Sequence, residues 1–187
     1  MNHYRAHFRA SDFFTVETAW RKTLYVFFFI ELGSHRVHFA GCTAHPIAAW
    51  VTQQARQLTW ASQDEQKQMR FLIRDRAAKF TAGCDTVFAA EGIEIVRTPY
   101  RAPKANAFAE RWIRRARAEA LDRLLILSEG HLRRVMQEYV AYYNQRRPHQ
   151  GMEQRCPRPI ERARKEGVVK CRDVLGGIIH DYEREAA

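Results

Sequence analysis

Residues 8–16 read FRASDFFTV, a run of aromatic and β-branched side chains that contains a single acid. Two similar runs follow, TLYVFFFIE at residues 23–31 and HRVHFAGC at residues 35–42. Short polar or Gly-Ser breaks separate the three runs, which is typical of consecutive strands joined by tight connections. The beginning of the chain therefore predicts a three-stranded antiparallel meander.

The stretch after the meander alternates between helical and strand patterns. Apolar residues recur every three to four positions in the predicted helices, and short β-branched runs mark the predicted strands. We expect a helix at 46–60, a strand at 69–73, a helix at 81–91 closed by Gly92 and a strand at 93–96. With the meander, this order predicts an α/β fold in which helices flank a mixed five-stranded sheet.

Two longer helices are expected after a loop at 98–105 that holds two prolines. The first covers about residues 106–125. The second begins after Ser128, a suitable N-cap, and stops at Pro148. Trp112, Tyr139 and Tyr143 fall at helical spacing, so we expect them in the core rather than as platforms for stacked bases.

Composition points to one domain and to a polyanionic partner. A chain of 187 residues, 46% of them hydrophobic, can close one sizeable core. Its 31 Lys and Arg against 21 Asp and Glu leave a formal charge of +10, and such an excess attracts polyanions through counterion release. Nucleic acid is therefore the first partner to test, although many basic proteins are merely soluble.

Two further patterns bear on location. The longest apolar run, residues 24–30, is far shorter than the roughly 20 residues of a membrane-spanning helix, and no leader peptide pattern opens the chain. We therefore expect a cytoplasmic protein without a membrane partner. The four cysteines form no C-x-x-C pair, which favours free thiols in a reducing compartment over a disulfide framework or a zinc site.

Three acids stand at positions that could serve one metal site. Asp12 lies inside an aromatic strand, where an acid is costly unless it is paired or bound to metal, and Asp75 follows the fourth strand. Glu110 lies one turn into a predicted helix, with Arg114 and Arg117 on the same face. Taken singly, each has an ordinary alternative: a solvated strand residue, a turn cap and an exposed helix residue.

Four stretches together resemble bacterial insertion-sequence transposases with an integrase-type catalytic core, which has an RNase H-like fold. They are SDFFTVET around Asp12, FLIRDRAAKF around Asp75, RAPKANAFAERW around Glu110 and YNQRRPHQG at 143–151. The distinctive Y-N-x-x-R-P-H element consists of Tyr143, Asn144, Arg147, Pro148 and His149. The resemblance runs from about Ala10 to Gly151, so the expected domains are a catalytic core at 1–151 and a basic C-terminal extension at 152–187.

The resemblance implies a DDE-type polynucleotidyl transferase. Asp12, Asp75 and Glu110 would hold two Mg²⁺ (or Mn²⁺) ions, with Asp12 bridging them, while DNA is cut and the 3′-hydroxyl attacks a target strand. Neighbouring basic side chains would hold DNA phosphates or else form a solvated basic face: Arg101, Lys104, Arg111, Arg114 and Arg117. His149 is expected to fix the last helix by a hydrogen bond rather than to act in catalysis.

Some features depart from the family pattern. Arg74 stands where His is frequent, but it should point to the opposite face of its strand from Asp75. Ala77 and Ala78 replace acidic or small polar residues. Family members also usually carry helix-turn-helix segments upstream, whereas Met1 stands just before the first strand, so recognition of element ends is expected to need a separate or missing N-terminal part. Like the family, the protein is expected to form homo-oligomers on DNA.

Two other functions fit parts of the sequence. A tyrosine recombinase would also be basic and cut DNA, but Tyr182 lies in the charged tail and nothing ties it to an Arg and His cluster. A truncated or domesticated core could bind DNA or assemble with partner subunits without cutting it. The complete set of three carboxylates favours the enzyme.

Overall fold

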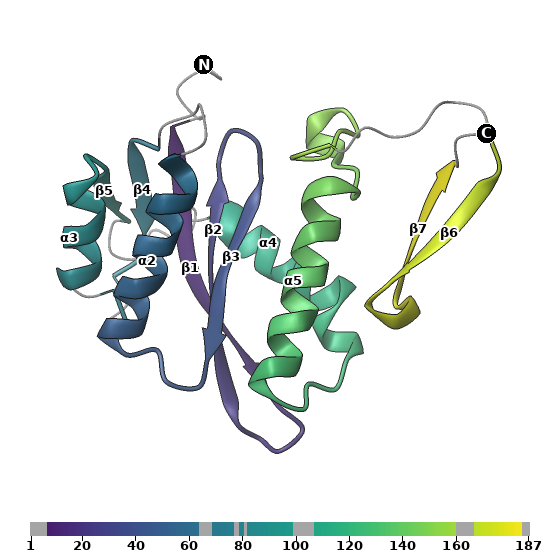
Figure 1. Ribbon diagram of the computed structural model, residues 1–187, viewed down its shortest axis with the longest axis horizontal. Helices are drawn as coiled ribbons and strands as arrows, with labels where there is room; N and C mark the ends of the chain where they lie inside the picture. The colour runs from purple at the N-terminus through teal and green to yellow at the C-terminus, as the bar shows by residue number, and fades with distance from the viewer. Residues whose placement is uncertain are drawn as a thin grey trace.

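The structure, a computed structural model, describes residues 7–63, 69–76, 79–80, 82–98, 107–159 and 167–184 (Figure 1). Its main sheet has five strands in the order β3-β2-β1-β4-β5. The strands are β1 (Phe8–Glu17), β2 (Thr23–Glu31), β3 (Val37–Thr43), β4 (Phe71–Arg74) and β5 (Glu94–Arg97). The helices are α2 (Ala48–Gln63), α3 (Ala82–Ala90), α4 (Ala107–Glu119) and α5 (Glu129–Gln145).

The sheet is mixed, as the sequence predicts. β1, β2 and β3 form the antiparallel meander, while β4 pairs with β1 and β5 pairs with β4 in parallel. Parallel strands need a crossover connection, and α2 and α3 provide the two crossovers. The predicted fold class is confirmed.

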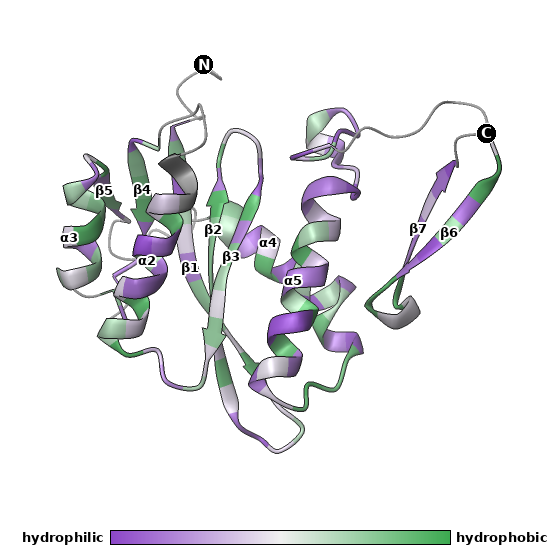
Figure 2. Ribbon diagram, viewed as in Figure 1, coloured by the Kyte–Doolittle hydropathy of each residue, from purple (hydrophilic) through white to green (hydrophobic). Residues whose placement is uncertain are grey.

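Helices cover both faces of this sheet, so a core forms on each face. On one face Phe14 and Phe28 belong to a cluster with residues of α4 and α5. On the other face Phe27 and Phe29 pack with residues of α2 and α3. Alternation along a strand produces this division, and β2, at the centre of the meander, is buried on both faces. In Figure 2 the colour of α5 alternates between hydrophobic and hydrophilic around its turns, as a helix with one buried face requires.

The start of α5 and the end of α3 agree with the sequence, whereas the end of α4 does not. The Ser128 hydroxyl accepts a hydrogen bond from the His131 amide at 3.1 Å, which confirms it as the N-cap of α5. Gly92 has a φ of 71°, which ends α3 in the left-handed conformation expected of a C-terminal glycine. α4, however, ends at Glu119 instead of near residue 125. Ala120 leaves helical geometry and the chain makes a short 3-10 turn, η2 (Leu121–Arg123), which buries Leu121 in the core.

The C-terminal segment forms a hairpin that the sequence did not reveal. β6 (Val169–Val174) and β7 (Ile179–Arg184) pair antiparallel and are joined by the turn η4 (Leu175–Gly177). The hairpin lies beside α5 (Figure 1), and Arg146, the C-cap residue of α5, donates to Asp181 of β7 at 2.7 Å. Val174 and Leu175 are buried in the cluster that includes α5. The extension is therefore attached to the core by both charge and apolar contact.

Two expectations from the sequence, free cysteines and no membrane-spanning helix, can be compared with the described residues. All four cysteines lie among them and are free thiols, as expected. Within the same part of the chain, no helix combines the length and the apolar character that crossing a membrane requires.

Candidate active site

Parallel pairing of β1 with β4 brings two of the three acids together. Ser11 of β1 is in register with Arg74 of β4. Asp12 directly follows Ser11 in the chain, and Asp75 directly follows Arg74. Because side chains alternate, Asp12 shares its face with Ala10 and Asp75 shares its face with Ile73. Ala10 and Ile73 both contact the core on the α4 and α5 side, so the two carboxylates face the same layer of helices.

Aromatic packing places the third acid. Trp112 on α4 is 1% exposed, and its ring centroid lies 4.2 Å from that of Phe28 and 5.9 Å from that of Phe14. Phe28 is the cross-strand partner of Asp12. Glu110 precedes Trp112 by two residues and is exposed, so the buried tryptophan holds the first turn of α4 over β1 and leaves the Glu110 carboxylate in solvent beside the sheet.

The other two carboxylates influence the ionisation of Asp12. The pKa of Asp12 is raised to about 6, chiefly by burial, and the negative charges of Asp75 and Glu110 act in the same direction. The Phe13 amide, which donates to Asp12 Oδ1 at 2.7 Å, and the charge of Lys79 act in the opposite direction. The negative charges of Asp75 and Glu110 thus act on Asp12, and a bound cation would relieve their repulsion.

The site is nevertheless more open than a cage for one ion. The three carboxylates, all within the described residues, do not form a group in which every ligand atom lies within 4.8 Å of the others. Asp12 and Asp75 come from adjacent strands, whereas Glu110 projects from a helix in the covering layer. The arrangement can present hard oxygen ligands to divalent cations from two sides.

Lys79 was not among the residues singled out from the sequence. Its Nζ lies 4.6 Å from the ring centroid of Tyr25 and 5.8 Å from that of Phe13, and its charge favours the ionised form of Asp12. The sole signal in the sequence is a basic residue four positions after Asp75. Ala77 and Ala78, between them, lie outside the described residues.

Arg74 supports the site from the opposite face of the sheet. It is 4% exposed, and its guanidinium donates to both carboxylate oxygens of Asp85 on α3, at 2.6 and 2.8 Å. Its Nη1 also donates to the backbone carbonyl of Asp75 at 2.9 Å. The side chain therefore points away from the carboxylates, as the strand geometry predicts, and holds the backbone of one of them.

The predicted DNA-contact residues lie in different surroundings. Arg114 is exposed on the face of α4 that carries Glu110. Arg117 donates to the Thr15 carbonyl at 2.6 Å and lies over the Phe14 ring, so it helps to attach α4 to β1. Arg111 lies over the ring of Phe108 at 5.7 Å. Arg101 and Lys104 fall outside the described residues.

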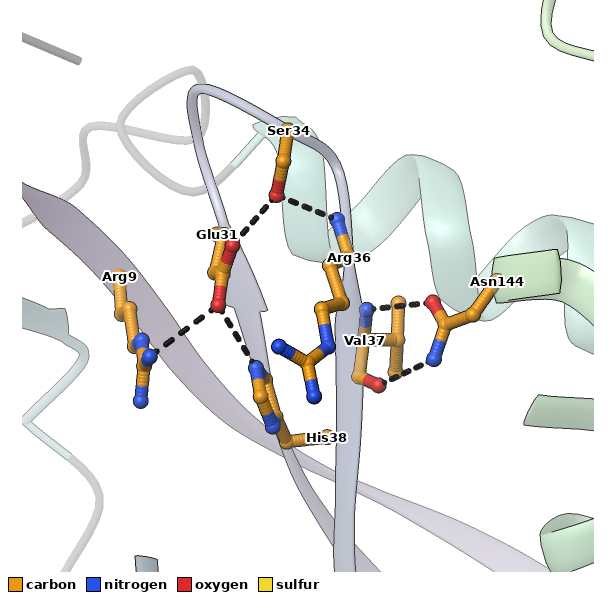
Figure 3. A network of polar contacts seen from close by, with 7 residues as sticks. All are labelled: Arg9, Glu31, Ser34, Arg36, Val37, His38 and Asn144. Carbon is orange, nitrogen blue, oxygen red and sulfur yellow. Dashed lines mark hydrogen bonds and ion pairs between the residues drawn. The ribbon is translucent and has the colours of Figure 1, made fainter. Parts of the chain in front are cut away.

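The Y-N-x-x-R-P-H element joins α5 to the rest of the fold. The Asn144 side chain accepts from the Val37 amide at 2.9 Å and donates to the Val37 carbonyl at 2.8 Å (Figure 3). β3 is an edge strand, so Asn144 takes the place of a neighbouring strand at this residue.

In the same view Glu31 receives hydrogen bonds from Arg9, His38 and Ser34.

The other residues of the element contact α4 or close the end of α5. Arg147 forms a bidentate pair with Glu119 of α4, with donor–acceptor distances from 2.6 to 3.1 Å. The ring of Tyr143 packs against Trp112 and His149, and Arg147 Nη1 donates to the Pro148 carbonyl. His149 is 2% exposed, its Nε2 lies 3.3 Å from the Tyr143 carbonyl, and burial lowers its pKa to about 4.

Sequence comparison agrees with this architecture. Residues 91–157 match the model of the integrase core domain family. This segment is therefore similar to an integrase core domain. It begins before β5 and includes α4 with Glu110, α5 and the Y-N-x-x-R-P-H element. No curated protein sequence is similar enough to the chain to count as a match.

Solved structures share the fold of this chain at low identity. A chain of the simian T-cell lymphotropic virus intasome, solved in complex with PP2A regulatory subunit B56 gamma, has a TM-score of 0.66 and 10% identity over 96% of this chain and 67% of its own. The catalytic domain of Mos1 mariner transposase has a TM-score of 0.59 and 16% identity, over 74% and 71%. The HTLV-2 integrase catalytic core in complex with magnesium has a TM-score of 0.59 and 11% identity, over 79% and 92%. These likenesses confirm the RNase H-like fold.

Proposed function

We propose that this integrase core is the catalytic domain of a DDE transposase or integrase, which cleaves DNA strands and transfers them to a target with the help of divalent metal. The observation that carries the proposal is the convergence of three carboxylates from β1, the end of β4 and the first turn of α4. Three elements far apart in the sequence would have no structural reason to bring like charges together at the surface.

The donor set fits magnesium or manganese. Carboxylate oxygens are hard ligands, which these cations prefer. Burial and the charges of Asp75 and Glu110 raise the pKa of Asp12, and bound positive charge would favour its ionised form. Asp12, Asp75 and Glu110 would hold the metal, which when bound activates the attacking and leaving oxygens of the phosphodiester. The open spacing of the carboxylates is compatible with two ions, the number that we propose.

Other side chains would position the nucleic acid and the ligands. Arg114, one helical turn after Glu110, would neutralise a phosphate beside the carboxylates, and the net charge of +10 would attract the duplex without reading its sequence. Arg74 would keep Asp75 in place through its backbone carbonyl. The carboxylates themselves act as ligands in this scheme and carry no proton.

A nicking and strand-transfer assay on labelled duplex DNA with Mn²⁺ or Mg²⁺ tests the proposal. We expect cleavage that depends on the metal and disappears in Glu110→Gln, a change that removes the charge and nearly preserves the shape. Glu94→Gln on β5 is the matched control, because Glu94 is also an exposed glutamate in a regular element. If wild type and Glu110→Gln bind DNA equally and neither cuts it, the chain is a binding core and the catalytic proposal fails.

Oligomerisation belongs to the same proposal. Joining two DNA ends requires at least two catalytic domains close together, and the relatives include a dimeric form and an intasome. We therefore expect this core to form homo-oligomers on DNA. Sedimentation that shows only monomers, even with DNA present, would contradict this part.

A further inference from the structure

The outward face of the C-terminal hairpin gathers three side chains of a different chemical kind from the carboxylate site. Cys171 and Asp173 are two residues apart on β6, and His180 on β7 is the direct cross-strand partner of Asp173. All three are exposed. The opposite face of the hairpin carries Val174 and Asp181, which are buried toward α5. Strand alternation thus separates a face used for packing from a face with ligand chemistry.

The ligand atoms of this trio are close enough to share one ion. His180 Nδ1 lies 2.8 Å from Asp173 Oδ1, Cys171 Sγ lies 3.9 Å from the same oxygen, and all three ligand atoms are within 4.8 Å of one another. In the part of the chain that the structure describes, no other three His, Cys, Asp or Glu residues meet that criterion. Zinc bonds of roughly 2.0 to 2.3 Å to nitrogen, oxygen and sulfur set tetrahedral donor atoms about 3 to 4 Å apart, close to the spacing seen here.

We propose that Cys171, Asp173 and His180 form a binding site for a borderline-soft divalent metal of the zinc class, with a fourth position for water or another ligand. Thiolate and imidazole select such a metal, whereas magnesium prefers the all-oxygen set of Asp12, Asp75 and Glu110. The two sites would therefore take different ions. In the absence of metal, Asp173 accepts hydrogen bonds from both His180 and the Cys171 thiol, so one carboxylate already draws the other two ligand atoms together.

The backbone under this site is held by the core. Leu175, directly after β6, donates a hydrogen bond from its backbone amide to Glu138 of α5 at 2.6 Å. Arg146 forms an ion pair with Asp181, whose side chain lies on the inward face of the hairpin. Gly176 and Gly177 have φ of 65° and 93°, which permits the tight turn that returns β7 alongside β6. A metal bound to both strands would join them on the outer face and stabilise the hairpin against fraying.

Cobalt titration of the reduced full chain tests the site. Co²⁺ is the probe because a thiolate ligand produces a sulfur-to-cobalt charge-transfer band, which carboxylates alone cannot produce. We expect the band to appear with one equivalent of Co²⁺, to vanish on addition of Zn²⁺, and to be absent in Cys171→Ser. His180→Gln should weaken binding at least about tenfold.

Two controls separate this result from other metal binding. Cys156→Ala removes a buried thiol outside the hairpin and should keep the band, and Asp12→Asn should keep it whether or not the catalytic proposal is correct. As a second readout, Zn²⁺ should raise the Tm of the wild type more than that of Cys171→Ser. Cobalt binding without a charge-transfer band, or a band that survives in Cys171→Ser, would overturn the proposal.

Discussion

Arg74 and Asp85 form a bidentate ion pair that connects β4 to α3, with the Arg74 Nη2 atom 2.6 and 2.8 Å from the two carboxylate oxygens. The same guanidinium donates to the backbone carbonyl of Asp75 at 2.9 Å. One side chain thus joins the α3 layer to the residue that precedes the turn at the active site. The pair lies on the face of the sheet opposite the carboxylates, so its contribution is to position Asp75.

Removal of Asp85 should therefore destabilise the whole domain. Asp85→Ala leaves Arg74, 4% exposed, as a buried charge without its carboxylate, and the expected loss is about 3 kcal/mol in the free energy of unfolding. Urea denaturation followed by far-UV circular dichroism measures it. Glu153→Gln removes an exposed ion pair with Arg155 and should change stability by less than about 0.5 kcal/mol. Equal effects of the two changes would contradict the assignment.

Asn144 should be needed in its own chemical form. Asn144→Ala leaves the amide and carbonyl of Val37 without their partners at a buried position, which should cost about 2 to 3 kcal/mol. Asn144→Asp can accept from the amide but, when ionised, cannot donate to the carbonyl, so it should fail to restore stability at neutral pH. Gln145→Ala, the next residue on α5, is the control. Full stability of Asn144→Asp would show that the donated hydrogen bond is unimportant.

Arg114 should contribute to DNA affinity without sequence preference. If it contacts one phosphate, Arg114→Gln should reduce the slope of log K against log salt by about 1 and weaken binding to all duplexes alike. Fluorescence anisotropy at several salt concentrations measures both effects. Arg123→Gln, exposed on η2 beyond the other end of α4, should keep the wild-type slope. Identical slopes for the two variants would remove Arg114 from the DNA-contact surface.

His149 should make stability depend on pH in the mildly acidic range. Burial lowers its pKa from 6.5 to about 4, so the unfolded chain binds the proton more readily than the folded chain. The neutral His149 ring contributes fully to the free energy of unfolding above pH 6.5. This contribution is lost as the pH falls toward 4, by at most about 1.4 kcal/mol per pH unit.

His149→Gln should therefore flatten the dependence of the unfolding free energy on pH between 6.5 and 4. His38 has a lowered pKa as well, so part of the slope should remain in the variant. His45→Gln, which changes an exposed ring, should keep the wild-type slope. An unchanged slope in His149→Gln would show that this ring is protonated as easily in the folded chain as in the unfolded chain.

Much of the fold was readable from local pattern. The aromatic runs at 8–16 and 23–31 predicted neighbouring strands, Ser128 predicted the start of α5, and Gly92 predicted the end of α3, because strand alternation, capping and left-handed glycine depend on few neighbouring residues. The predicted end of α4, near residue 125, was wrong, because the helix ends about six residues earlier, at Glu119. Leu121 continues the helical pattern, but tertiary packing draws it into the core through a 3-10 turn.

The sequence by itself determined the α/β architecture, the excess positive charge and the identity of the three candidate ligands, because periodicity, composition and motif residues are properties of the chain. Only the tertiary structure decided which side chains meet. The parallel register of β1 with β4 places Asp75 beside Asp12, and the packing of Trp112 on Phe28 brings Glu110 to them. It also decided that Arg74 pairs with Asp85 and that Cys171, Asp173 and His180 share one face of a hairpin. Contacts of this kind depend on strand pairing and on layers of helices closing over a sheet, and neither is encoded in the spacing of any single motif.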